Sequence, residues 1–124
     1  MRDERGRVLL VRHADLHAWL LPGGAVEPDE APAEAAAREA LEETGLEVET
    51  GRVLGAFGGP AFHTVYPNGD RIAYVPVVFE GRIVGGRARP DGVETTEVRW
   101  FDPAEVADLA LTPGARELLA CLLP

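Results

Sequence analysis

Residues 24–46 decide the fold of this chain, and they read GAVEPDEAPAEAAAREALEETGL. The stretch joins a loop that starts at a glycine to an alanine-rich, acidic segment that stops at Gly45. Pro32 suits the first position of a helix, because its fixed φ and its missing N–H cost nothing there. Gly45 suits the position just after the last turn, where the backbone is left-handed. The pattern therefore predicts a helix over residues 32–44.

The acidic residues of this predicted helix gather on one face. Each residue advances by about 100° around the axis, so Glu39, Glu42 and Glu43 at i, i+3 and i+4 share a patch. Like charges at that spacing destabilise a helix, so helix stability gives no reason for the cluster. We expect a positive partner there, Mg²⁺ or Mn²⁺, because carboxylates are hard ligands and no cysteine or close histidine pair accompanies them. A solvated acidic face is the simpler alternative.

The same stretch resembles the signature of the Nudix (MutT-like) hydrolase family. That signature reads Gly, five residues, Glu, seven residues, then Arg-Glu-U-x-Glu-Glu-x-Gly-U, where U is a bulky aliphatic residue. Ala40 is a small occupant of a U position, and similarity to the family extends through residues 19–23, 66–70 and 99–101. The positions that fall in register are Gly24, Glu30, Arg38, Glu39, Glu42, Glu43, Gly45 and Leu46.

The resemblance implies an enzyme that hydrolyses the diphosphate linkage of a nucleoside diphosphate joined to another moiety. ADP-ribose, a nucleoside triphosphate and a nucleotide sugar all stay open as substrates. It also implies that Glu39, Glu42 and Glu43, with the carbonyl of Gly23, hold a divalent cation that neutralises the phosphate oxygens. The alternative is a Nudix-like binding or sensor module that does not cleave its nucleotide. Such modules often lose acids of the signature, and this chain keeps all of them.

Two catalytic roles follow from the resemblance. The family arginine, here Arg38, holds the loop and orients the acids, although a surface ion pair with Glu34 or Glu42 is the simpler reading. A general base is also needed, and the family takes it from the signature or from a later loop. Glu42 is the first candidate for the base, and Glu97 or Glu94 is the next.

Composition limits the other possibilities. With 124 residues, the chain is expected to form one domain over residues 1–124. A net charge of −9 argues against binding a nucleic-acid polymer, because that affinity needs basic residues to neutralise phosphates. We expect no membrane partner, since no apolar run approaches the length of a span. The lone Cys121 excludes an intrachain disulfide and fits the cytoplasm, and a homodimer, common in the family, stays open.

The remaining elements predict a mixed sheet flanked by helices, and the resemblance specifies the α/β/α sandwich of the Nudix fold. Asn68-Gly69 between two β-rich runs is a hairpin signal, and residues 85–92 are expected to form a flexible loop that reaches over a bound anion. The predicted strands are 7–12, 19–21, 46–56, 62–66, 72–79 and 95–101, followed by a helical turn over 102–109 and a helix capped by Thr112.

The N-terminus departs from the family pattern. Nudix domains usually have another strand before the turn at residues 1–6, so we expect the first strand of the fold to be missing here. Either the true start lies upstream of Met1, or the neighbouring strand keeps an open edge that invites pairing with another chain.

Overall fold

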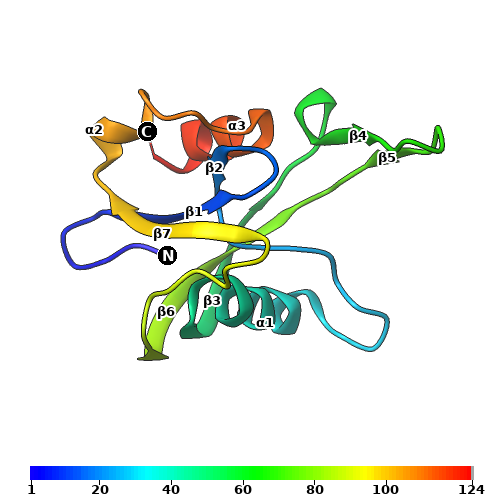
Figure 1. The fold of residues 1–124 in the computed structure, drawn as a ribbon. Helices are drawn as coiled ribbons and strands as arrows, with labels where there is room; N and C mark the ends of the chain where they lie inside the picture. Colours follow the sequence, from blue (N-terminus) through cyan, green and yellow to red (C-terminus); the bar gives the residue numbers. More distant parts are fainter. Residues whose placement is uncertain (124) are drawn as a thin grey trace.

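The computed structural model describes residues 1–123 and has the predicted α/β architecture (Figure 1). The strands pair in the orders β2-β1-β7, β3-β6 and β4-β5, and a parallel bridge joins Trp19 to Leu111. In chain order the elements are β1 (Val8–His13), β2 (Ala18–Leu20), α1 (Pro32–Thr44), β3 (Leu46–Ala56), η1 (Pro60–Phe62), β4 (His63–Val65), β5 (Arg71–Ala73), β6 (Val77–Gly86), β7 (Thr95–Phe101), α2 (Pro103–Val106) and α3 (Pro113–Leu122).

Helix α1 has the predicted bounds. Its first turn lacks a capping side chain at Ala31, and Glu34 compensates by accepting the N–H of Ala31 at 3.2 Å. Its last turn ends at Gly45, whose φ of 75° is left-handed and whose N–H donates to the carbonyl of Leu41. The proline and the glycine that bracket the sequence pattern therefore set both ends of the helix.

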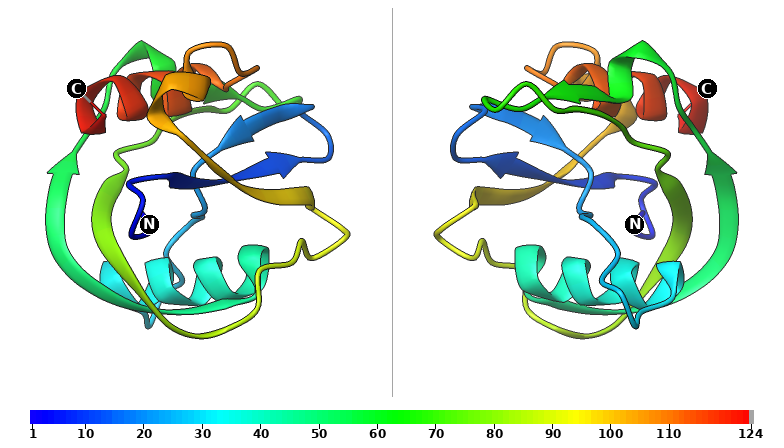
Figure 2. Two further views of the ribbon diagram at one scale, coloured as in Figure 1. Left: turned by 90° about the vertical axis from the view of Figure 1, so that its left-hand side faces the viewer. Right: turned by 90° about the vertical axis from the view of Figure 1, so that its right-hand side faces the viewer.

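The β2-β1-β7 sheet lies between α1 on one side and α2 with α3 on the other (Figure 2). Side chains alternate across a strand, so β1 contributes to the packing on both faces, and its residues Val8 to Val11 are all buried. Trp19 packs edge-on against Phe101, with ring centroids 4.8 Å apart. The core cluster comprises Val8, Leu10, Trp19, Phe101, Val106 and Leu119. This core packs the sheet against α2 and α3.

The β3-β6 ribbon curves past the edge of this sheet from α1 towards α3 (Figure 2). Its end meets the end of α1 at Gly45 and Gly86, where the two backbones touch directly. The segment after β6 is tied to the same point, because the N–H of Arg87 donates to Gly45 and that of Arg89 to Thr44, at 3.2 and 2.7 Å. The predicted flexible loop over 85–92 is therefore wrong at its start: β6 runs through Gly86 and the next residues are hydrogen-bonded.

The hairpin predicted around Asn68-Gly69 forms, but its second strand is shorter than expected. Strand β5 ends at Ala73 and β6 begins at Val77, so the predicted strand 72–79 is split. Pro76 lies in the gap, and its carbonyl accepts the N–H of Phe57. Because proline lacks an N–H, the ladder cannot continue through it.

The first residues lie beside β1. Arg2 forms a bridge with Val8, and the N–H of Leu9 donates to the carbonyl of Met1 at 3.1 Å. Part of the edge expected to be open is therefore paired by residues of this chain.

The C-terminal helix α3 begins at Pro113 and is capped as predicted by Thr112, whose hydroxyl accepts the N–H of Ala115 at 3.1 Å. Its residues Leu118 and Leu119 are buried. In the described part of the chain, no helix has the length and apolar character needed to cross a membrane.

The contact at Gly45 leads to a stability prediction. Gly45→Ala should lower the free energy of unfolding by at least about 2 kcal/mol, because the new Cβ meets the carbonyl of Arg87 at a left-handed φ of 75°. Gly69→Ala is the matched control: its φ is 93°, yet nothing lies within 4 Å of the added Cβ, so the loss should stay near 1 kcal/mol. Urea unfolding of both variants measures the difference, and equal losses would contradict the steric argument.

Candidate active site

Arg38 connects the loop before α1 to the acidic face of the helix. Its Nε donates to Glu30 Oε2 at 2.7 Å, and its Nη2 donates to Glu30 Oε1 at 2.9 Å. The same Nη2 donates to the carbonyl of Ala25 at 3.1 Å. Nη1 donates to Glu39 Oε1 at 2.9 Å and to Glu42 Oε2 at 3.2 Å. One rigid guanidinium fork therefore fixes both the loop and two of the three signature acids.

These contacts shift the pKa values of both Arg38 and Glu30. Hydrogen bonding to Glu30 is the main cause that raises the pKa of Arg38 above its ordinary value. The reciprocal bond from Arg38, followed by the N–H of Glu27, lowers the pKa of Glu30. The pair therefore stays ionised, and Glu34 is not part of it because it caps the helix instead.

Glu43 is the buried member of the acidic face, with 6% of its surface exposed. Burial is the main cause that raises its pKa to about 8, followed by a hydrogen bond to Glu39, the charge of Glu39 and, more weakly, the charge of Glu94. The N–H of Gly23 donates to Glu43 Oε1 at 3.4 Å and acts in the opposite direction. The two carboxyl groups thus lie close together, and the buried one, Glu43, keeps its proton at neutral pH.

Gly24 lets the Glu39 carboxylate lie against the loop backbone. A Cβ added at Gly24 would be 2.5 Å from both Cδ and Oε1 of Glu39. Gly24, the first glycine of the signature, therefore leaves room for the side chain of Glu39. The sequence alone did not reveal this role. Gly23 has no such contact, since nothing lies within 4 Å of a Cβ built there.

The three signature acids do not point to one place. Glu39 and Glu43 meet, whereas Glu42 turns towards Arg38 and its side chain is 57% exposed. Within residues 1–123 no group of three or more His, Cys, Asp or Glu side chains has an arrangement that could hold a metal ion. Glu42 accepts a hydrogen bond from Arg38 and Gly23 donates its N–H to Glu43, so a ligand set of Glu39, Glu42, Glu43 and the Gly23 carbonyl stays a prediction.

The two later glutamates occupy different places. Glu97 is an exposed residue of β7 opposite Arg12, and among residues 1–123 no hydrogen bond or ion pair joins it to α1. Glu94 lies in the turn before β7, where its charge acts on Glu43. Sequence reasoning could not separate the two, because only the tertiary packing of β7 decides which one faces the helix.

The turn that carries Glu94 is held against α1. Asp91 Oδ1 accepts the N–H groups of Val93, Glu94 and Thr95, and the hydroxyl of Thr95 donates to the carbonyl of Glu43 at 3.3 Å. Sequence reasoning missed Asp91 and Thr95. The Asp91-Gly92 dipeptide was a usable signal, since it is typical of a turn closed by a side chain.

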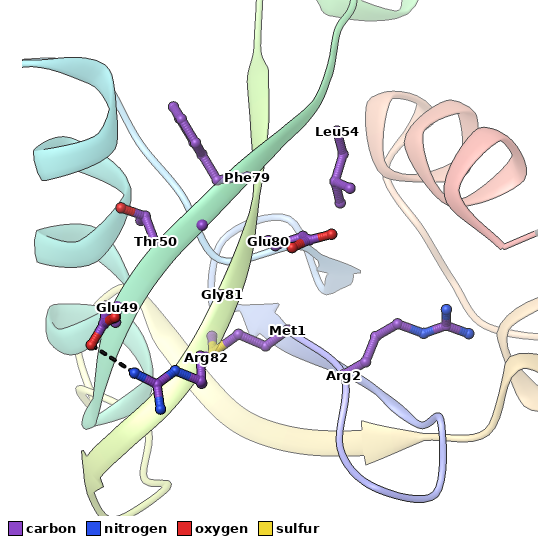
Figure 3. A pocket seen from close by; sticks show the side chains of 10 residues that line it. Met1, Arg2, Glu49, Thr50, Leu54, Phe79, Glu80, Gly81 and Arg82 are labelled. Atoms are coloured by element: carbon purple, nitrogen blue, oxygen red, sulfur yellow. Dashed lines mark hydrogen bonds and ion pairs between the residues drawn. The ribbon is translucent and has the colours of Figure 1, made fainter.

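A pocket lies away from these acids, on the β3-β6 ribbon beside the first residues (Figure 3). Its volume is about 460 Å³, and the ion pair of Arg82 with Glu49, 2.9 Å long, lies at its edge. It is lined by Met1, Arg2, Glu49, Thr50, Gly51, Leu54, Phe79, Glu80, Gly81 and Arg82. The acidic face and the pocket have no lining residue in common.

The residues fit a hard divalent cation in their chemistry. Glu39 and Glu43 bring two carboxylates into contact, and Arg38 reaches Glu39 but has no ion pair with Glu43. A nearby positive charge stabilises the charged form of a buried carboxylate that lies next to a second one. Carboxylate oxygens are also the ligands that Mg²⁺ and Mn²⁺ prefer.

Comparison with known proteins extends this picture. A MutT-like protein from Streptomyces ambofaciens is 40% identical over 119 residues, covering 96% of this chain and 70% of the relative. A Bacillus subtilis protein, provisionally named an 8-oxo-dGTP diphosphatase, is 36% identical over 84% of this chain, which spans only 63% of that relative.

The fold is shared with solved structures as well. A crystal structure of an ADP-ribose pyrophosphatase from Streptococcus suis superimposes with a TM-score of 0.72 at 29% identity, covering 93% of this chain and 78% of that one. The family model described as the NUDIX domain matches residues 1–122. With the signature, the fold and the relatives in agreement, this chain belongs to the Nudix family.

Proposed function

We propose that this chain is a divalent-metal-dependent hydrolase that cleaves the diphosphate linkage of a nucleoside diphosphate joined to another moiety. The observation that carries the proposal is the contact between Glu39 and the buried Glu43. Two carboxyl groups placed together at a loop held by Arg38 weaken the isolated fold, so their placement favours a function that needs negative charge there.

Glu39 and Glu43 are the residues proposed to hold Mg²⁺ or Mn²⁺, and Glu42 joins them if its exposed side chain leaves Arg38. When bound, such a cation neutralises the phosphate oxygens and lowers the pKa of a coordinated water molecule. A carbonyl ligand from Gly23 stays a prediction.

The chain itself positions the reacting groups. Arg38 fixes the loop through Glu30 and Ala25, so the glycine backbone lies next to the acids. Glu42 stays the first candidate for the general base, since its carboxylate is exposed and can accept a proton from water. Between the later candidates, the charge of Glu94 acts on Glu43, whereas Glu97 lies opposite Arg12 on β7, and this supports Glu94 over Glu97.

The names of the relatives suggest which substrates to test first. ADP-ribose and 8-oxo-dGTP come from those names, and a nucleotide sugar completes the panel. Incubation with Mg²⁺ or Mn²⁺ and separation of the products tests the proposal against the sensor alternative. Tight binding of a nucleotide without any product would favour the sensor. We also propose a cytoplasmic location, in keeping with the exposed, unpaired thiol of Cys121.

Removing two acids of the signature should abolish turnover. The double variant Glu42→Gln/Glu43→Gln is expected to lose at least about 100-fold in kcat/KM, because both the cation site and the first candidate base are neutralised. Glu117→Gln, an exposed glutamate of α3, is the matched control and should keep full activity. Steady-state kinetics with Mg²⁺ decide the matter, and undiminished activity of the folded double variant would refute the proposal.

The contact at Gly24 predicts a loss of activity without a loss of stability. In Gly24→Ala the new Cβ should displace the Glu39 carboxylate. Because a misplacement of about 1 Å can slow catalysis by about 100-fold, kcat should fall about 10- to 100-fold. The carboxylate ends a flexible side chain, so the urea midpoint should change little. Gly23→Ala meets nothing within 4 Å and should retain its activity. Similar kcat values for the two variants would argue against a defined position for Glu39.

The pKa of Glu43 predicts how the stability of the metal-free protein depends on pH. The folded chain holds the proton of Glu43 up to about pH 8, whereas the ordinary value is 4.5, so unfolding releases a proton between these limits. The free energy of unfolding should therefore fall as the pH rises through this window, by on the order of a few kcal/mol.

Glu43→Gln provides the control for this pH effect. Urea unfolding in a chelating buffer at several pH values should show a flatter dependence in the variant, which should be the more stable protein at pH 8. Adding Mg²⁺ should then stabilise the wild type but not the variant. A wild-type slope that Gln leaves unchanged would assign the pH effect to another group.

A further inference from the structure

We propose that Asp91 is a positioning residue of the active site, which holds Glu94 and the main chain of Glu43 in their relative places through Thr95. This inference rests on the hydrolase function proposed above. Asp91 itself is exposed, and among residues 1–123 no hydrogen bond or ion pair joins it to the signature acids, so its effect is transmitted through the turn.

The contacts of Asp91 are concentrated on the residues that carry Glu94. Its Oδ1 accepts the N–H groups of Val93, Glu94 and Thr95 at 2.8, 2.9 and 2.9 Å. Its own N–H donates to the Thr95 hydroxyl at 3.1 Å. These bonds to the carboxylate outweigh the effect of burial and lower the pKa of Asp91, so the acceptor is ionised at neutral pH.

Thr95 connects this turn to α1. It is 1% exposed, and its hydroxyl donates to the carbonyl of Glu43 at 3.3 Å. The last carbonyls of a helix have no partner within the helix, so Thr95 satisfies a group that burial would otherwise leave without one. The start of β7 and the last turn of α1 are thereby joined at the residue that bears the buried carboxylate.

Glu94 is held by its main chain on both sides. Its N–H donates to Asp91 at 2.9 Å, and its carbonyl accepts the N–H of Ala14 at 2.8 Å. The turn has a closing backbone bond of its own, from the N–H of Gly92 to the carbonyl of Thr95 at 3.1 Å. The turn can therefore close without the Asp91 carboxylate, whose additional bonds fix the residues between its ends.

Asp91→Ala is the first test. Turnover of ADP-ribose or 8-oxo-dGTP with Mg²⁺, whichever the wild type hydrolyses faster, should fall about 10-fold or more in kcat, while KM stays within about 3-fold. Asp91→Asn keeps an acceptor oxygen and should recover most of kcat. A folded Asp91→Ala protein with wild-type kcat would overturn the proposal, as would equal losses in both variants.

Asp3→Ala is the matched control. Asp3 Oδ1 caps another turn by accepting the N–H groups of Arg5 and Arg7 at 3.0 and 2.8 Å. Its removal should lower stability in a similar way and leave kcat unchanged. A drop in kcat equal to that of Asp91→Ala would assign the effect to general loosening and would refute the positioning role.

Thr95→Val keeps the test open if Asp91→Ala does not fold. It removes the hydroxyl bond to Glu43 while keeping the size of the side chain, so kcat should fall, and Thr95→Ser should restore it. Wild-type kcat in Thr95→Val would count against the proposal.

Amide hydrogen exchange separates this inference from the proposed function. In Asp91→Ala the amides of Glu94 and Thr95 should exchange about 10-fold faster, and the amide resonances of Glu43 and Thr44 should shift, whether or not the wild type is active. Unchanged exchange and resonances would overturn the proposal. If the wild type cleaves no member of the panel while these changes occur, the hydrolase assignment fails and the coupling through Asp91 stands.

Discussion

The hydrogen bonds of Arg38 are the interaction on which the rest of the site depends. Two acids at i and i+3 repel each other on any helix, and here one guanidinium contacts both while it also holds the loop through Glu30 and Ala25. The arginine is thereby ionised and directed by its partners. Among residues 1–123 no ion pair is formed by Glu43, so this buried acid of the signature lacks a compensating charge there.

Local sequence chemistry predicted much of the fold. Residues with restricted or permissive backbones set the ends of α1, because Pro32 starts a helix easily and Gly45 accepts a left-handed φ. Strands β3 and β7 have the predicted bounds for a similar reason, since loops with glycines, prolines or Asp-Gly flank them. The errors lie where tertiary contacts decide: the segment after Gly86 is ordered by carbonyls of α1 that no local pattern reveals.

Only those features of the candidate site that follow from helical periodicity could be predicted from the sequence. The shared face of Glu39, Glu42 and Glu43 follows from their spacing, but the side-chain directions do not, and Glu42 turns to Arg38 whereas Glu43 turns inward. The choice between Glu94 and Glu97 depends on the register of β7 with β1, where Glu97 pairs with Arg12. Register is a property of two distant segments, so one segment read alone cannot supply it.

The touching backbones of Gly45 and Gly86 divide the surroundings of the acids into two walls with different capacity to adapt. One wall, formed by the ends of α1 and β6, is joined main chain to main chain, with the side chain of Arg89 lying against Gly45. The other is the loop of residues 22–31, fastened to the helix by the fork of Arg38. The space beside the acids is therefore more easily altered through the side chains of that loop than at the joined main chains of the other wall.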